Sequence, residues 1–105
     1  PDGKIRVLTL DPRLEEFLAS SIKKAEHMAY LAVDPKKAQL ILQQIAKEVE
    51  KVAKLGEQAI ILCSPQVRSH LKKFTERQIP HLTILSYNEI AQEIELEAQG
   101  VIAGV

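Results

Sequence analysis

Ser64 and Pro65 stand where a short apolar run ends and a helical pattern begins, and anion chemistry is conceivable at this junction. The free N–H groups at a helix N-terminus attract anions, and Arg68 would add a positive charge one turn later. A small anion- or phosphate-binding α/β enzyme or regulatory domain could use this helix start. The glycines that let a phosphate approach backbone are missing, however, and no Walker or dinucleotide glycine pattern occurs. A plain helix cap is therefore favoured, with phosphate binding as the alternative.

Cys63 is the only cysteine, so no internal disulfide can form and a reducing compartment is expected. It could pair with a histidine, but it lies in the apolar run 59–63, where burial raises the pKa of a thiol. His27, His70 and His81 have no ligand spacing with one another or with a second cysteine. We therefore expect a buried core cysteine, no metal and no cofactor.

The carboxylates do not form the close pair that acid–base catalysis on one substrate requires. Glu15 and Glu16 are adjacent on a predicted helix, so their side chains diverge, and we interpret both as surface charges. Asp11 and Asp34 each precede a proline, an arrangement typical of a helix N-cap. We therefore expect no catalytic residues and a chain that is not an enzyme.

A basic cluster on the third predicted helix is the one local charge asymmetry in the sequence. Overall, 14 Lys and Arg balance 14 Asp and Glu, which removes the broad attraction that general nucleic-acid or membrane-surface binders need. No interleaved aromatic residues accompany the cluster, so no nucleic-acid partner is expected and RNA binding is only an alternative. The cluster could be a solvated helix face without a binding role. The alternative that we carry forward is a protein-interaction surface formed by Arg68, Lys72, Lys73 and Arg77.

The hydrophobic pattern predicts the elements that would position these residues. Aspartate–proline pairs start two helices, whose apolar stripes run to Ala25 and to Gly56. The segment 26–33 is irregular and fits either a short strand or a packed loop. The apolar run 59–63 is typical of a central strand covered on both faces. The predicted order is strand 5–10, helix 12–25, helix 35–55, strand 59–63, helix 65–78, strand 82–85, a capping box at 86–89 and strand 93–102.

Strands that alternate with helices indicate an α/β fold with right-handed crossovers. We expect a small, mostly parallel sheet of three to four strands packed with helices, in a single domain over residues 1–105. The last strand follows a short connection and is expected to be antiparallel, at an edge. In it Glu93, Glu95 and Glu97 alternate with apolar residues, which predicts one face in water and charges that discourage pairing with another chain.

The composition predicts a chain that lies outside the bilayer. No apolar run approaches the roughly 20 residues that a helix needs to cross it. The chain begins Pro1-Asp2-Gly3-Lys4, without an initiator Met or a signal-peptide pattern, so we expect a piece of something larger. With balanced charge and a single cysteine, the cytosol is the compartment that fits best.

Four segments occur here in the order in which a known family carries them, and they span almost all of the chain. On these segments the chain resembles the FlhA family, the large membrane subunit of the flagellar type III protein export gate, in the last subdomain of its cytoplasmic region. Residues 75–80, followed by 85–89, look more like the flagellar branch than the virulence-secretion branch. Glu57-Gln58-Ala59 departs from the prolines of many relatives, which affects only the local turn. The four segments are VLTLDP at 7–12, YLAVDP at 30–35, ILCSPQVR at 61–68 and LSYNEI at 85–90.

The resemblance implies a non-catalytic module of a protein export apparatus. It further implies a parent protein in the bacterial inner membrane, with this segment soluble on the cytoplasmic side and the membrane reached only through a missing N-terminal region. The implied partners are other subdomains of the same protein, identical subunits in a ring, export-apparatus components and substrate–chaperone complexes. Packing within the subunit, or shaping the ring, is the role implied for this segment in protein secretion and flagellum assembly.

Overall fold

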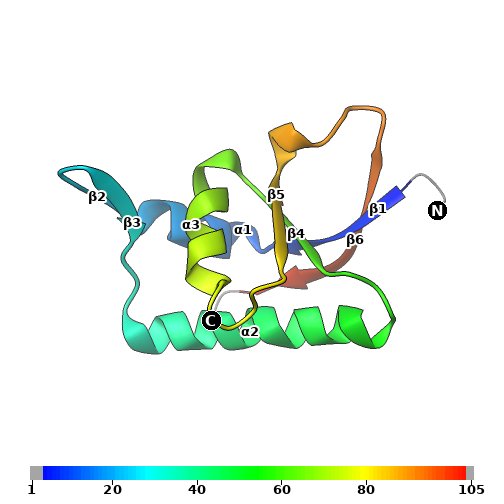
Figure 1. The fold of residues 1–105 in the computed structure, drawn as a ribbon, viewed down its shortest axis with the longest axis horizontal. Helices are drawn as coiled ribbons and strands as arrows, with labels where there is room; N and C mark the ends of the chain where they lie inside the picture. The colour runs from blue at the N-terminus through cyan, green and yellow to red at the C-terminus, as the bar shows by residue number, and fades with distance from the viewer. Residues whose placement is uncertain (1–3, 104–105) are drawn as a thin grey trace.

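A computed structural model of the chain describes residues 4–103. In that range the main sheet has four strands, and a separate hairpin has two (Figure 1). The elements in chain order are β1 (Lys4–Leu10), α1 (Pro12–Ser20), β2 (Ile22–Ala25), β3 (Met28–Leu31), α2 (Pro35–Lys54), β4 (Ile60–Cys63), α3 (Pro65–Thr75), β5 (Thr83–Ser86), the single 3-10 turn η1 (Tyr87–Glu89) and β6 (Glu95–Ile102).

The main sheet has the order β5-β4-β1-β6, and all of its neighbouring strands are parallel. This confirms the predicted α/β fold with a mostly parallel sheet. The apolar run that predicted a central strand is β4, which lies between β5 and β1 and buries Ile61, Leu62 and Cys63. Continuous apolar sequence is what a strand covered on both faces requires.

The last strand lies at the predicted edge, but the prediction that it is antiparallel is wrong. β6 pairs with β1 in parallel, from Lys4 opposite Glu95 to Leu10 opposite Ile102. A short connection implies an antiparallel neighbour only when the two strands are adjacent, and β5 and β6 lie at opposite edges of the sheet. The segment 87–94 therefore crosses the sheet and returns the chain to the starting end of β1 (Figure 1).

The first helix is shorter than predicted, and a hairpin replaces its last turns. α1 ends at Ser20, and the hydroxyl groups of Ser20 and Ser21 donate to the carbonyl of Phe17 at 3.0 and 2.7 Å. Such local bonds offer the backbone an alternative to further helix. Ile22 and Ala25, predicted on the helix stripe, instead bound β2, which pairs antiparallel with β3. The undecided segment 26–33 thus contains a strand.

Both aspartate–proline pairs cap helices as predicted. The carboxylate of Asp11 accepts from the backbone N–H of Arg13 at 2.8 Å. The carboxylate of Asp34 accepts from the N–H groups of Lys36 and Lys37 at 3.2 and 3.3 Å. These bonds satisfy donors that a helix N-terminus otherwise leaves free. After α2, Gly56 adopts a φ of +77°, the left-handed conformation that glycine permits without strain.

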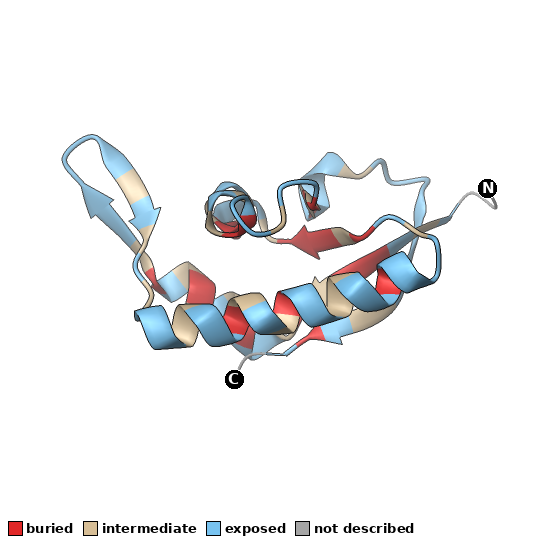
Figure 2. Cartoon of the chain, turned by 60° about the horizontal axis from the view of Figure 1, so that its bottom comes forward, coloured by how far each residue is buried: buried red, intermediate tan, exposed pale blue. Residues whose placement is uncertain are grey.

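One hydrophobic core lies between the main sheet and the helices. The buried stripe of α2 faces inward while its other face is exposed, as predicted, and the hairpin of β2 and β3 projects from the body (Figure 2). Among residues 4–103, every helix is too short or too polar to span a bilayer. The buried hydrophobic residues with an exposed fraction of 1% or less are Val7, Leu8, Leu14, Leu18, Ile41, Ile45, Ile61, Cys63, Val67, Leu71 and Ile102.

Candidate functional site

The start of α3, the candidate anion site, is occupied by a carboxylate of the chain itself. Glu15 on α1 accepts a hydrogen bond from the backbone N–H of Ser64, with 2.5 Å between the oxygen and the nitrogen. β1 and β4 are parallel neighbours, so the helices that follow them start at the same end of the sheet. Glu15 is half-buried there, and its interpretation as a surface charge is wrong, whereas Glu16 is exposed as predicted.

Arg68, the second part of the candidate anion site, also has a partner within the chain. Its guanidinium lies 3.1 Å from the carboxylate of Glu89. That carboxylate accepts from the backbone N–H and from the hydroxyl of Ser86, both at 2.9 Å, within the predicted capping box. The backbone bond, then the hydroxyl bond, and then the charge of Arg68 lower the pKa of Glu89. Arg68 and Glu89 therefore balance each other's charge at this end of the sheet.

Cys63 is fully buried, as predicted, and its thiol is protonated at neutral pH. Burial is the main cause that raises its pKa, from an ordinary 9.0 to about 12, and the charge of Glu15 adds to the effect. A thiol is nucleophilic only as the thiolate, so this cysteine is unsuited to covalent chemistry. Burial likewise raises the pKa of Tyr87, on η1. Across residues 4–103, no group of three or more His, Cys, Asp or Glu side chains could hold a metal ion.

Ligands of α/β sheets commonly bind outside the carboxyl ends of the parallel strands, the end at which α3 begins. Here Glu15 accepts from the N–H of Ser64, and Arg68 pairs with Glu89. The sequence could not reveal the bond from Glu15, because spacing along the chain does not show that β1 and β4 are neighbours. The arrangement stabilises helix starts and offers a phosphate neither the N–H of Ser64 nor an unpaired Arg68.

The basic cluster of α3 divides into two pairs with different surroundings. Arg68 pairs with Glu89, and the ammonium group of Lys72 donates to the carbonyls of Leu82 and Pro80 at 2.7 and 3.4 Å. Lys72 thus holds the loop between α3 and β5 against the helix. Lys73 and Arg77 are exposed. The part of the cluster that faces solvent is therefore its C-terminal half.

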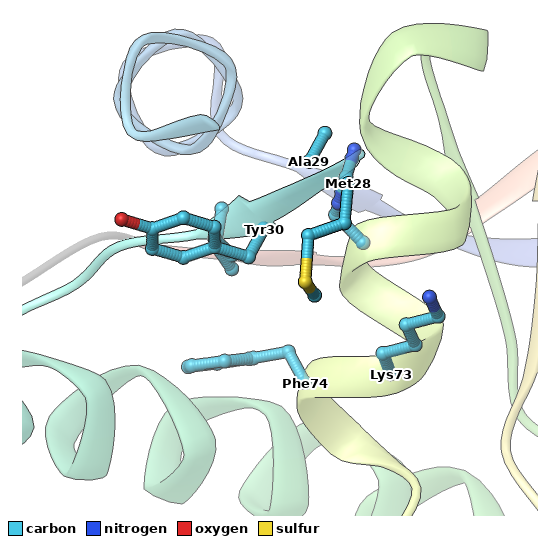
Figure 3. Close-up of a pocket in the computed structure, with 7 residues that line it drawn as sticks. Met28, Ala29, Tyr30, Lys73 and Phe74 are labelled. Carbon is cyan, nitrogen blue, oxygen red and sulfur yellow. The ribbon is translucent and has the colours of Figure 1, made fainter. Parts of the chain in front are cut away.

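A shallow apolar pocket lies between the hairpin and α3, beside Lys73 (Figure 3). The volume of the pocket is about 200 Å³. The pocket could not be predicted from the sequence, because β3, which forms one wall, lies in the segment 26–33 that the pattern left undecided. Its lining residues are Met28, Ala29, Tyr30, Leu31, His70, Lys73 and Phe74.

The glutamates of β6 form ion pairs with its neighbour β1. Arg6 lies 2.9 Å from Glu57 and 3.4 Å from Glu97, and Lys4 lies 4.0 Å from Glu97. Gln99 donates to the other oxygen of Glu57 at 2.7 Å. Glu57, which precedes β4, is therefore bonded to both β1 and β6.

The expected alternation of buried and exposed residues fails in the first half of β6. All residues from Glu95 to Ala98 are exposed, including Leu96 with an exposed fraction of 42%. A buried face returns only at Ile102. The beginning of this strand is therefore exposed on both faces and only its end is covered, so the alternation in the sequence indicated burial that this fold does not supply.

The fold is shared with two solved structures of larger chains. The Chlamydia pneumoniae CdsV protein superposes with a TM-score of 0.85 at 31% identity, over 96% of this chain and 29% of that chain. The nonameric SctV-C of EPEC superposes with a TM-score of 0.81 at 24% identity, over 93% of this chain and 29% of that chain. The chain therefore has the fold of a part, 29%, of each of these larger chains.

The family follows from sequence. The FHIPEP family model matches residues 1–95, and the chain belongs to that family. The flagellar biosynthesis protein FlhA of Bacillus subtilis is 38% identical over 98 residues, covering 93% of this chain and 14% of that protein. The low calcium response locus protein D of Yersinia pestis is 26% identical, covering 88% of this chain and 13% of that protein. The resemblance to the FlhA family is confirmed, and the chain spans a small part of these relatives.

Proposed function

We propose that this chain is a non-catalytic module in the cytoplasmic part of a type III protein export gate, where it packs within the subunit and shapes a ring of identical subunits. The observation that carries the proposal is the match over 96% of this chain to CdsV, of which it forms 29%. A segment that has the same fold within a much larger chain is suited to pack against the rest of that chain and against neighbouring subunits. At the start of α3 the N–H of Ser64 bonds to Glu15 and Arg68 pairs with Glu89, which supports a role without catalysis.

The ring of identical subunits is proposed because this chain has the same fold as part of a protein that forms an oligomer. SctV-C of EPEC is nonameric, and CdsV has been solved in complex with the CdsO protein. We extend to this chain a homo-oligomeric ring in the longer protein, contacts with other export components and passage of substrate–chaperone complexes. The cytoplasmic side of the bacterial inner membrane is the proposed location. The 38% identity to a flagellar protein supports the flagellar branch.

The solvent-facing part of the basic cluster is the proposed contact surface. Lys73 and Arg77 are exposed, whereas Arg68 and Lys72 already bond within the chain. Exposed cations contribute to the rate and specificity of protein association more than to its affinity. We therefore assign recognition to Lys73 and Arg77, and internal stability to Arg68 and Lys72.

A deletion in the longer protein tests this function. Removing residues 1–105 from it should abolish export of flagellar proteins to the medium, while an immunoblot of the membrane fraction still detects the shortened protein. Cys63→Ala in the full-length protein serves as the control and should export normally, because the buried thiol does no chemistry. Normal export by the deletion variant would refute the proposed role.

A further inference from the structure

The pocket between the hairpin and α3 combines a fixed floor with exposed apolar walls. Leu31 and Phe74 pack against the core, so the base of the pocket is anchored. Met28 and Tyr30 keep exposed fractions of 61% and 45%. In Figure 3 the side chain of Met28 extends from β3 toward the ring of Phe74. Exposed large apolar side chains gathered around one hollow are typical of an interaction site.

The size of the pocket favours a single side chain of a protein over a small molecule. Its volume of about 200 Å³ lies below the roughly 300–1,000 Å³ of typical ligand and cofactor sites. An anchor residue inserted into a small apolar pocket is the usual centre of a protein–protein contact. Met28 adds an adaptable wall, because an unbranched thioether side chain can adjust to different shapes.

The charges around the pocket define the partner further. None of its lining residues is acidic, and Lys73 and His70 stand in the wall formed by α3. Lys23 lies directly opposite Tyr30 in the hairpin, so the two side chains share one face. Lys73 and Lys23 therefore flank the apolar hollow from its two sides, and carboxylates complement them.

We propose that this pocket binds an acidic amphipathic helix of a partner protein. One large apolar side chain of that helix enters between Met28 and Phe74, and its carboxylates pair with Lys73 and Lys23. A helix presents an apolar stripe beside charged positions, which matches a narrow apolar hollow with basic walls. The inference goes beyond the proposed ring role, and either can fail without the other.

Binding of designed peptides to the 105-residue chain tests the proposal. The probe is a helical peptide with leucine at every third or fourth position and glutamate elsewhere, and its counterpart carries lysine in place of glutamate. NMR amide shifts caused by the acidic peptide should centre on residues 28–31 and 70–74. The lysine peptide should bind at least about tenfold more weakly, because its charges oppose those of the rim. Equal binding of both peptides, or shifts centred elsewhere, would overturn the proposal.

Two exposed substitutions and two matched controls locate the site. Met28→Ser and Lys73→Glu should each weaken binding about five- to tenfold, since few interface residues carry most of the affinity. Leu55→Ser and Lys47→Glu change the same kinds of residue on exposed positions away from the pocket and should leave affinity unchanged. Equal effects at both sets would contradict the proposal. So would a concentration-dependent dimer that Met28→Ser abolishes, because the occupant would then be a second copy.

Discussion

The carboxylate of Glu15 on α1 accepts a 2.5 Å hydrogen bond from the backbone N–H of Ser64, at the start of α3. The bond joins residues that are 49 positions apart in the chain. It places a negative charge where the dipole of α3 favours one, and where a phosphate would otherwise bind. The same contact thus stabilises the fold and closes the site that the sequence had suggested for small anions.

Removing this carboxylate should destabilise the chain. Glu15→Ala leaves the N–H of Ser64 without its charged acceptor, and we expect a loss of about 1–2 kcal/mol in the free energy of unfolding. Glu16→Ala, on the exposed side of the same helix, should change it by less than about 0.5 kcal/mol. Urea denaturation of the three proteins measures both values. Equal losses of unfolding free energy in the two variants would show that the bond between Glu15 and Ser64 does not stabilise the fold.

Phosphate should not stabilise the unmodified chain. A ligand that binds only the folded state raises the melting temperature, but here the N–H of Ser64 and the guanidinium of Arg68 already have partners. Melting curves in phosphate and in chloride at equal ionic strength should coincide. A phosphate-specific rise that Arg68→Ala removes would revive the alternative of an anion-binding domain.

Cys63 should be unreactive until the chain unfolds. Its thiol is buried and its pKa is about 12, so Ellman's reagent at pH 8 should label it only after urea is added. The folded pKa exceeds the unfolded value of 9.0, so the contribution of this group is full below pH 9 and is lost as pH rises from 9 toward 12. Cys63→Ala should therefore lose less stability than the parent chain over that range. Rapid labelling of the folded chain would contradict the account.

Glu89 should contribute to the loss of folding stability that occurs at acid pH. Its folded pKa lies below the ordinary value of 4.5, so its contribution is present above pH 4.5 and is lost as pH falls through the folded pKa. In Glu89→Gln the midpoint of urea unfolding should fall less between pH 5 and acid conditions than in the parent chain. Glu93→Gln, at an exposed position, is the comparison that should behave like the parent.

Local signals in the sequence predicted most elements of the fold. Asp11 and Asp34, each before a proline, marked two helix starts, because capping requires only residues that are neighbours in the chain. The periodic apolar stripe of α2 and the run ending at Cys63 predicted their elements for the same reason. Burial of Cys63 followed directly from its place in that run.

Features that depend on distant neighbours could not be predicted in this way. The direction of β6 depends on its position beside β1, at the edge opposite β5. The bond between Glu15 and Ser64 depends on β1 and β4 being adjacent. The end of α1 was missed because Ile22 and Ala25 continue the helical spacing, whereas the serine hydroxyl groups before them bond back to Phe17. Helical periodicity alone therefore overestimated the helix.

The mass of the chain in solution, alone and mixed with the remaining cytoplasmic part of the longer protein, tests the central claim most directly. Light scattering should show the chain alone as a monomer of 11.7 kDa, and the mixture should contain a species heavier than the other part by that mass. Such a complex is expected of a module that packs within the subunit. A monomer that remains separate from the other part at every concentration would contradict the account.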